Sequence, residues 1–139
     1  RQKTLRPQIH HMCHSGDILG YLENLLKPVS PHAPCTENFP SSLGCFVANC
    51  VTELGTSDPD IVKMSHEILA EIRREIRLGI EREMARGGWN FRTNAEEIAG
   101  MIFMLLMGLR VLYRSGVDLT WARESIAFLR THFKSSGKS

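Results

Sequence analysis

The chain has 139 residues, of which 42% are hydrophobic and 23% are charged, a balance typical of one soluble globular domain with a single core. Its 17 basic and 15 acidic residues leave a formal net charge of +2, which is too small to indicate nucleic-acid binding by these residues themselves. The longest apolar run, 98–109, is far shorter than the roughly 20 residues of a membrane span, so no membrane partner is expected.

The chain begins at Arg1 without a secretory signal, so it is interpreted as a fragment or a processed product. We expect residues 1–16 to be the remnant of a preceding helix or a linker. Its cysteines form no CxxC pair, and free buried thiols suit a reducing cytoplasm. The four cysteines are Cys13, Cys35, Cys45 and Cys50.

Two short helices are predicted in the first half of the chain. Asp17 supplies N-cap chemistry for a helix that ends near Lys27, where prolines begin. The segment 28–40 holds four of the six prolines and is predicted to be a loop. A second helix is expected over 43–54, with Gly55 ending it.

The longest predicted helix follows. Asp58 and Pro59 are a strong helix start, an N-cap residue followed by proline at the first helical position. Apolar residues then recur at helical spacing until Gly87. A helix of this length would be roughly 43 Å long at the usual rise per residue.

Two more helices complete the prediction. Thr93 and Glu96 have the spacing of a capping box, and the helix that they begin should end at Gly116. Asp118 or Thr120 is expected to cap the last helix. The chain is therefore predicted to be an all-α bundle of about five helices, with one domain over 17–134 and a disordered tail over 135–139.

The pattern of the last two helices indicates self-association. The helix around 98–112 is apolar nearly all round, and the last helix carries Trp121 and Phe128 apart from its Ile126 stripe. Two such helices per subunit could form a homodimeric four-helix bundle, although a monomer with a wrapped central helix would also bury them. The predicted interface consists of Ile102, Leu105, Leu106, Leu109, Leu112, Trp121, Ala122, Ser125, Phe128, Leu129 and His132.

Two segments resemble a known family. They read Gly-Cys-Phe-Val-Ala-Asn-Cys-Val-Thr-Glu-Leu over 44–54 and Met-Gly-Leu-Arg-Val-Leu-Tyr-Arg-Ser-Gly over 107–116. With the Asp-Pro-Asp that opens the long helix, this order resembles the C-terminal regulatory domain of TetR-family transcriptional regulators, over roughly 17–133. Met107 stands where one branch of that family often has glutamine.

The resemblance implies a ligand-binding and dimerisation domain of a cytoplasmic repressor. The family's operator DNA is bound by an N-terminal helix-turn-helix domain, which this sequence does not contain, so DNA binding is expected only through a domain preceding Arg1. The last two helices of the family usually form the dimer interface. A small inducer in the regulatory domain shifts the spacing of the two DNA-reading heads.

The inducer is expected to be small and mainly apolar. Methionines suggest an adaptable lining, and Asn49 is a polar residue on an otherwise apolar helix. Each of these side chains could equally belong to the core. The predicted pocket consists of Phe46, Asn49, Cys50, Met64, Ile68, Met101, Phe103, Met104 and Met107.

No cofactor and no enzyme activity are expected, because no catalytic motif is found. A cluster of His10, His11, Cys13 and His14 has part of a zinc-ligand spacing, but no fourth ligand is evident and an accidental polar stretch explains it as well. The alternative to a regulatory domain is a free-standing helical module that binds a small molecule or a protein.

Overall fold

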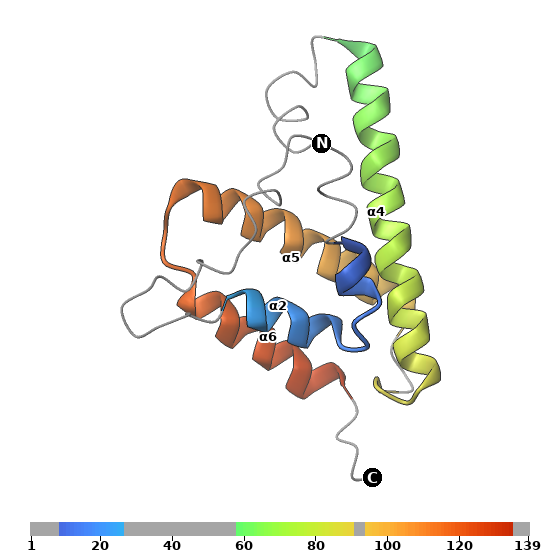
Figure 1. Cartoon of the computed structure of the whole chain (residues 1–139), viewed down its shortest axis with the longest axis vertical. Coiled ribbons are helices and arrows are strands. Elements are labelled where there is room, and N and C mark those ends of the chain that lie inside the picture. Colours follow the sequence, from blue (N-terminus) through green and yellow to red (C-terminus); the bar gives the residue numbers. More distant parts are fainter. Residues whose placement is uncertain (1–8, 27–57, 91–93, 135–139) are drawn as a thin grey trace.

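The computed structural model describes residues 9–26, 58–90 and 94–134, and the regular elements in these ranges are helices (Figure 1). The all-α class is confirmed for this part of the chain. The predicted loop over 28–40 and the predicted helix over 43–54 lie outside the described residues. The helices are α2 (Ile18–Leu25), α4 (Pro59–Ala85), α5 (Ala95–Ser115) and α6 (Thr120–Phe133), and residues 9–13 form a short helical stretch before α2.

The predicted starts of α2 and α4 are confirmed. The Asp17 carboxylate accepts a hydrogen bond from the Gly20 amide at 3.1 Å and caps α2. The Asp58 carboxylate accepts from the Asp60 amide at 3.0 Å, with Pro59 at the first position of α4. A side-chain acceptor at such a position satisfies an amide that has no partner within the helix, typically worth about 1 kcal/mol.

The start of α5 differs from the predicted capping box. Asn94 is the cap, because its side-chain oxygen accepts from the amides of Glu96 at 2.8 Å and Glu97 at 3.2 Å. Thr93 lies outside the described residues. The Glu96 carboxylate, expected to reach back to the cap, instead pairs with Arg77 of α4 at 3.4 Å. The Glu96 carboxylate therefore pairs with the Arg77 guanidinium of the neighbouring helix, where the capping box predicted a bond to the cap of its own helix.

The two longest helices end before the glycines that the sequence predicted as their ends. Gly87 after α4 and Gly116 after α5 both have a φ of +79°, a conformation that glycine adopts without steric cost. At the start of α6 the cap position is Leu119, which makes no side-chain cap bond. The Asp118 carboxylate bonds the Thr120 hydroxyl at 2.8 Å and so supports the first turn of α6.

The helices gather around the C-terminal half of α4. Figure 1 shows α5 crossing α4, while α2 and α6 run side by side on one side of α5. The contacts agree with this view, because α4 packs mainly on α5 and α6 packs mainly on α2. Apart from Ser65, the buried residues of α4 lie between Ile72 and Glu83, which places the core at that end of the helix.

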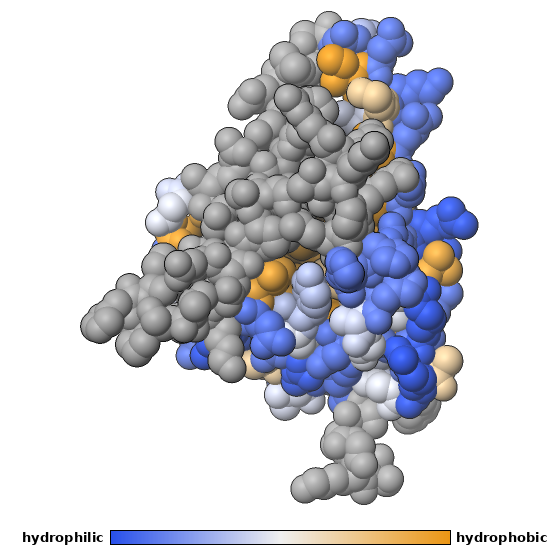
Figure 2. Space-filling view, viewed as in Figure 1, coloured by the Kyte–Doolittle hydropathy of each residue, from blue (hydrophilic) through white to orange (hydrophobic). Residues whose placement is uncertain are grey.

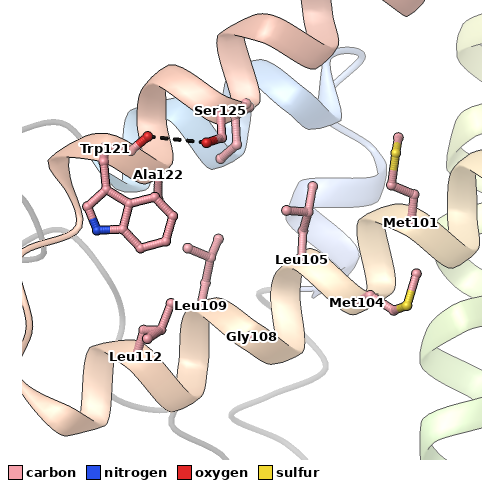
Figure 3. A pocket seen from close by; sticks show the side chains of 10 residues that line it. Met101, Met104, Leu105, Gly108, Leu109, Leu112, Trp121, Ala122 and Ser125 are labelled. Atoms are coloured by element: carbon pink, nitrogen blue, oxygen red, sulfur yellow. Dashed lines mark hydrogen bonds between the residues drawn. The ribbon is translucent and has the colours of Figure 1, made fainter.

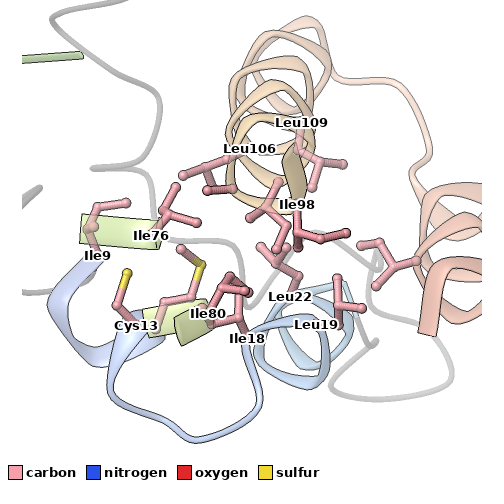
Figure 4. Close-up of a cluster of buried hydrophobic side chains, with 14 of the residues drawn as sticks. Ile9, Cys13, Ile18, Leu19, Leu22, Ile76, Ile80, Ile98, Leu106 and Leu109 are labelled. Atoms are coloured by element: carbon pink, nitrogen blue, oxygen red, sulfur yellow. The ribbon is translucent and has the colours of Figure 1, made fainter. Parts of the chain in front are cut away.

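The core contains side chains from every described helix. The short helical stretch contributes Ile9 and Cys13, and α2, α4 and α5 meet around Leu22, Ile80 and Leu106 (Figure 4). Several of these side chains have no exposed surface, and each fully buried leucine or isoleucine contributes roughly 1.5–3 kcal/mol relative to exposure. α2 is therefore held firmly although it is short.

The surface of the described residues carries both hydrophilic and hydrophobic side chains. Figure 2 shows hydrophilic side chains predominating along the outer side of α4, with small hydrophobic areas between them. Among the helices that the structure describes, none has the length and apolarity needed to cross a lipid bilayer.

Candidate functional site

The apolar helix α5 divides its hydrophobic residues between two sides. Ile98, Ile102 and Leu106 face the core and are at most 4% exposed. On the other side Met104 is 68% exposed and Val111 is 59% exposed. A surface helix normally carries polar residues at such positions, so these two exposed apolar side chains are unusual.

The helix α6 presents a similar excess of apolar surface. Only Ala122 and Ile126 are buried, whereas Trp121 and Phe128 are 53% and 60% exposed. Large exposed aromatics that gather with other apolar residues are typical of binding surfaces.

A groove of about 310 Å³ lies between these two helices. Figure 3 shows the side chains of Trp121 and Leu109 pointing toward one another across it. The one hydroxyl group in its lining belongs to Ser125, and that hydroxyl already donates to the Trp121 carbonyl at 3.4 Å. The lining consists of Met101, Met104, Leu105, Gly108, Leu109, Leu112, Trp121, Ala122, Ser125 and Ile126.

This lining determines what the groove can do. It offers no carboxylate, imidazole or amine to a bound molecule, so binding there would depend on apolar contact and shape. The two methionine side chains are flexible and polarizable, which lets the groove adapt to ligands of different outline.

The predicted pocket residues are only partly brought together. Met101 and Met104 line the groove. Phe103 and Met107 are half-buried against the core, as is Ile68 on α4. Met64 is 45% exposed on α4, and the remaining three predicted pocket residues, Phe46, Asn49 and Cys50, lie outside the described residues.

Most of the predicted interface residues line the groove or lie beside it. Leu105, Leu109, Leu112, Trp121, Ala122 and Ser125 are in its lining. Phe128 and His132 lie one turn apart farther along α6, with ring centroids 4.1 Å apart, and Leu129 is half-buried.

The structure also assigns some predicted interface residues to the interior of the single chain. Ile102 and Leu106 have no exposed surface, while Leu109 and Ala122 are 4% exposed. These side chains belong to the chain's own core, and Leu109 and Ala122 also line the groove. They leave little surface for a second copy to contact.

A buried carboxylate that was not predicted lies at the other end of α6. Glu83 is only 2% exposed. It lies seven residues, or about two helical turns, after Ile76 and therefore falls on the buried face of α4. Its oxygens accept from the Ile18 amide at 2.9 Å, the Trp89 indole N–H at 2.9 Å and the Lys134 ammonium at 3.0 Å. A glutamate on an apolar stripe was the signal that could have identified it.

Near the Glu83–Lys134 pair, a second set of ion pairs joins α6 to α2 at the surface. Arg130 of α6 donates to Asp17 at 3.1 Å and to Glu23 at 2.8 Å, so α6 pairs with α2 through two carboxylates. Partial burial alone would raise the pKa of Asp17, but the Gly20 amide and the charges of Lys134 and Arg130 outweigh it and hold that pKa below its usual value. Burial alone would lower the pKa of Arg130, but its carboxylate partners raise it.

The histidine-rich segment near the start does not converge on one point. His10 and His14 stack with ring centroids 4.0 Å apart, whereas Cys13 is buried on the core side. Burial, followed by the charge of Glu75, raises the pKa of the Cys13 thiol to about 12. Within residues 9–26, 58–90 and 94–134, no three His, Cys, Asp or Glu side chains form a group that could hold a metal ion.

Comparisons of the chain with protein-family models, with curated proteins and with solved structures each gave no match. The resemblance to TetR-type regulators therefore rests on the sequence segments quoted above, of which 107–115 forms the end of α5.

Proposed function

We propose that this chain is the ligand-binding and dimerisation domain of a TetR-type transcriptional regulator. In this proposal it couples the binding of a small, mainly apolar molecule to release of operator DNA. Contact with DNA would belong to a helix-turn-helix domain outside these 139 residues.

The observation that carries the proposal is the apolar face formed by α5 and α6. Met104, Val111, Trp121 and Phe128 are all more than half exposed on these two helices. Two helices with such a face can pair with the same two helices of a second copy around a two-fold axis, which buries the face of both. The order of helices, with the apolar pair last, agrees with the family's dimer arrangement.

The groove supports the ligand-binding part of the proposal. Its lining suits an apolar molecule and lies beside the proposed interface. A ligand that fits better at one angle between α5 and α6 than at another would shift the population of dimer geometries. The DNA-reading domains would move with the dimer, so affinity for the operator would change.

Native mass spectrometry of the purified 139-residue chain tests dimerisation and ligand binding together. We expect a dimer, with or without a retained small molecule of low polarity. A monomer that retains such a molecule would favour the free-standing binding module instead. A monomer with nothing bound, at concentrations up to about 100 µM, where even a weak micromolar dimer would form, would contradict the proposal.

The regulatory role is tested separately on the coding sequence and its product. We expect the codons upstream of Arg1 to encode, in frame, a three-helix domain containing a helix-turn-helix. The full-length protein should shift its own upstream DNA in a gel, and the 139-residue chain should not. A start codon immediately before Arg1 would contradict the regulatory role and leave dimerisation as a separate question.

A further inference from the structure

The last helix has fewer buried residues for its length than α2, although Leu129 and Phe133 also pack partly buried against the core. Of its fourteen residues only Ala122 and Ile126 are buried, and its main packing partner among the described helices is α2. α2, in contrast, has Ile18, Leu19 and Leu22 completely buried. Elements with few buried apolar contacts open at lower free energy than the core they cover.

A cluster of charges closes the C-terminal end of this weakly packed helix. The Lys134 ammonium lies 3.0 Å from the Glu83 carboxylate, and their side chains are 12% and 1% exposed. The same ammonium lies 5.0 Å from the centre of the Trp89 ring, where a cation–π attraction adds to the ion pair. Because it is shielded from water, this pair is screened by salt much less than a surface pair.

The backbone reinforces the contact at the same point. The Asn90 amide donates to the Phe133 carbonyl at 3.0 Å, and the Asn90 side chain donates to the His132 carbonyl at 3.0 Å. These bonds tie the end of α6 to the turn that follows α4. If Lys134 leaves, Glu83 is left as a buried carboxylate without its cation, which is costly.

We propose that Glu83 and Lys134 form an ionic latch at the end of α6, and that opening it, with loss of the Arg130 pairs to Asp17 and Glu23, lets α6 detach from α2 as a unit while α2, α4 and α5 stay folded. α6 supplies one wall of the apolar groove through Trp121, Ser125 and Ile126. Opening the latch therefore changes the width of the groove and the angle of the apolar face. This inference is independent of the proposed function, because it concerns motion within one chain.

Hydrogen exchange followed by mass spectrometry tests the latch. Lys134→Met removes the ammonium and keeps an apolar stem over Trp89, and Lys63→Met removes an exposed lysine of α4 as the matched control. We expect Lys134→Met to speed exchange of the α6 amides at least tenfold while amides of 72–80 and 98–109 keep their rates. Lys63→Met should change neither set.

Self-association through α6 would also protect its amides, so the comparison is made with Phe128→Glu added to every chain and at several protein concentrations. Lys134→Arg, which keeps the charge, should restore most of the protection. Equal acceleration of α6 and of the core amides would overturn the proposal, because α6 would then open only with the whole molecule. Unchanged α6 rates would also overturn it.

A second measurement needs no substitution at the latch. In low concentrations of urea, exchange of the α6 amides should depend weakly on denaturant, because a partial opening exposes little surface. The amides of α5 should show the full dependence of global unfolding. If both sets follow one common dependence from zero denaturant upward, α6 does not open as a separate unit.

Discussion

The main-chain carbonyl of Cys13 lies against Gly79, so close that a β-carbon at Gly79 would stand 2.8 Å from the Cys13 oxygen. The N-terminal helical stretch can therefore approach α4 only because this position has no side chain. Arg82, one turn further along α4, donates to the same Cys13 carbonyl at 3.0 Å. The two contacts fix where the stretch 9–13 joins the core.

Gly79→Ala should destabilise the protein. Alanine gains about 1 kcal/mol of helix propensity over glycine, but the backbone of Cys13 would have to move, and overpacking of this kind costs typically 1–3 kcal/mol. Urea unfolding followed by circular dichroism measures the difference. Gly100→Ala is the matched control, because nothing described lies within 4 Å of its β-carbon, and it should stabilise by up to about 1 kcal/mol. Equal effects of the two substitutions would contradict the close approach.

The Cys13 thiol should be unreactive in the native protein. Burial and the nearby Glu75 carboxylate raise the pKa of this thiol to about 12, so the nucleophilic thiolate is scarce at pH 8. A chain in which Cys35, Cys45 and Cys50 are replaced by serine isolates Cys13 for a thiol-labelling assay. Labelling should be slow in buffer and fast in denaturant. Rapid labelling in buffer would show that the segment 9–13 leaves the core.

Asp17 should make stability fall in acid. Its pKa is lowered in the folded chain from the ordinary value of 3.8, mainly by the Gly20 amide and by Lys134 and Arg130, which together outweigh partial burial. The stability that this carboxylate contributes is fully present above its unfolded-state pKa and is lost as pH falls through the lower folded-state pKa.

The Asp17→Asn chain keeps a good N-cap and removes the charge. The difference in urea midpoint between the two proteins should be constant from about pH 5 to pH 7 and should shrink below about pH 4. A difference that does not change with pH would mean that the charge of Asp17 contributes nothing.

Phe128→Glu should abolish self-association without unfolding the chain. Phe128 is 60% exposed, so the substitution should change stability by no more than about 0.5 kcal/mol, whereas a charge in an apolar interface is strongly unfavourable. Light scattering after size-exclusion chromatography reports the mass. Met64→Glu, an equivalent change at a 45% exposed residue of α4, should leave the mass unchanged. A dimer that persists in Phe128→Glu would exclude this part of α6 from the interface.

Local signals predicted the described helices well because their causes lie within a few residues. Asp17 and Asp58 cap helices through amides two or three positions away, and Gly87 and Gly116 end helices through their own backbone conformation. The one-residue error at α5 has a local cause as well, since threonine and asparagine are both good caps and stand side by side in the sequence.

The sequence by itself therefore determined that the chain is helical in its described ranges, where most helices begin and end, and that α5 carries more apolar residues than one face needs. Only the tertiary structure decided which of those residues are core. Ile102 and Leu106 are buried and Met104 is exposed, because α2 and α4 cover one side of α5. The partners of Glu83 were also set by tertiary contact, because Ile18 and Lys134 are 65 and 51 positions away along the chain.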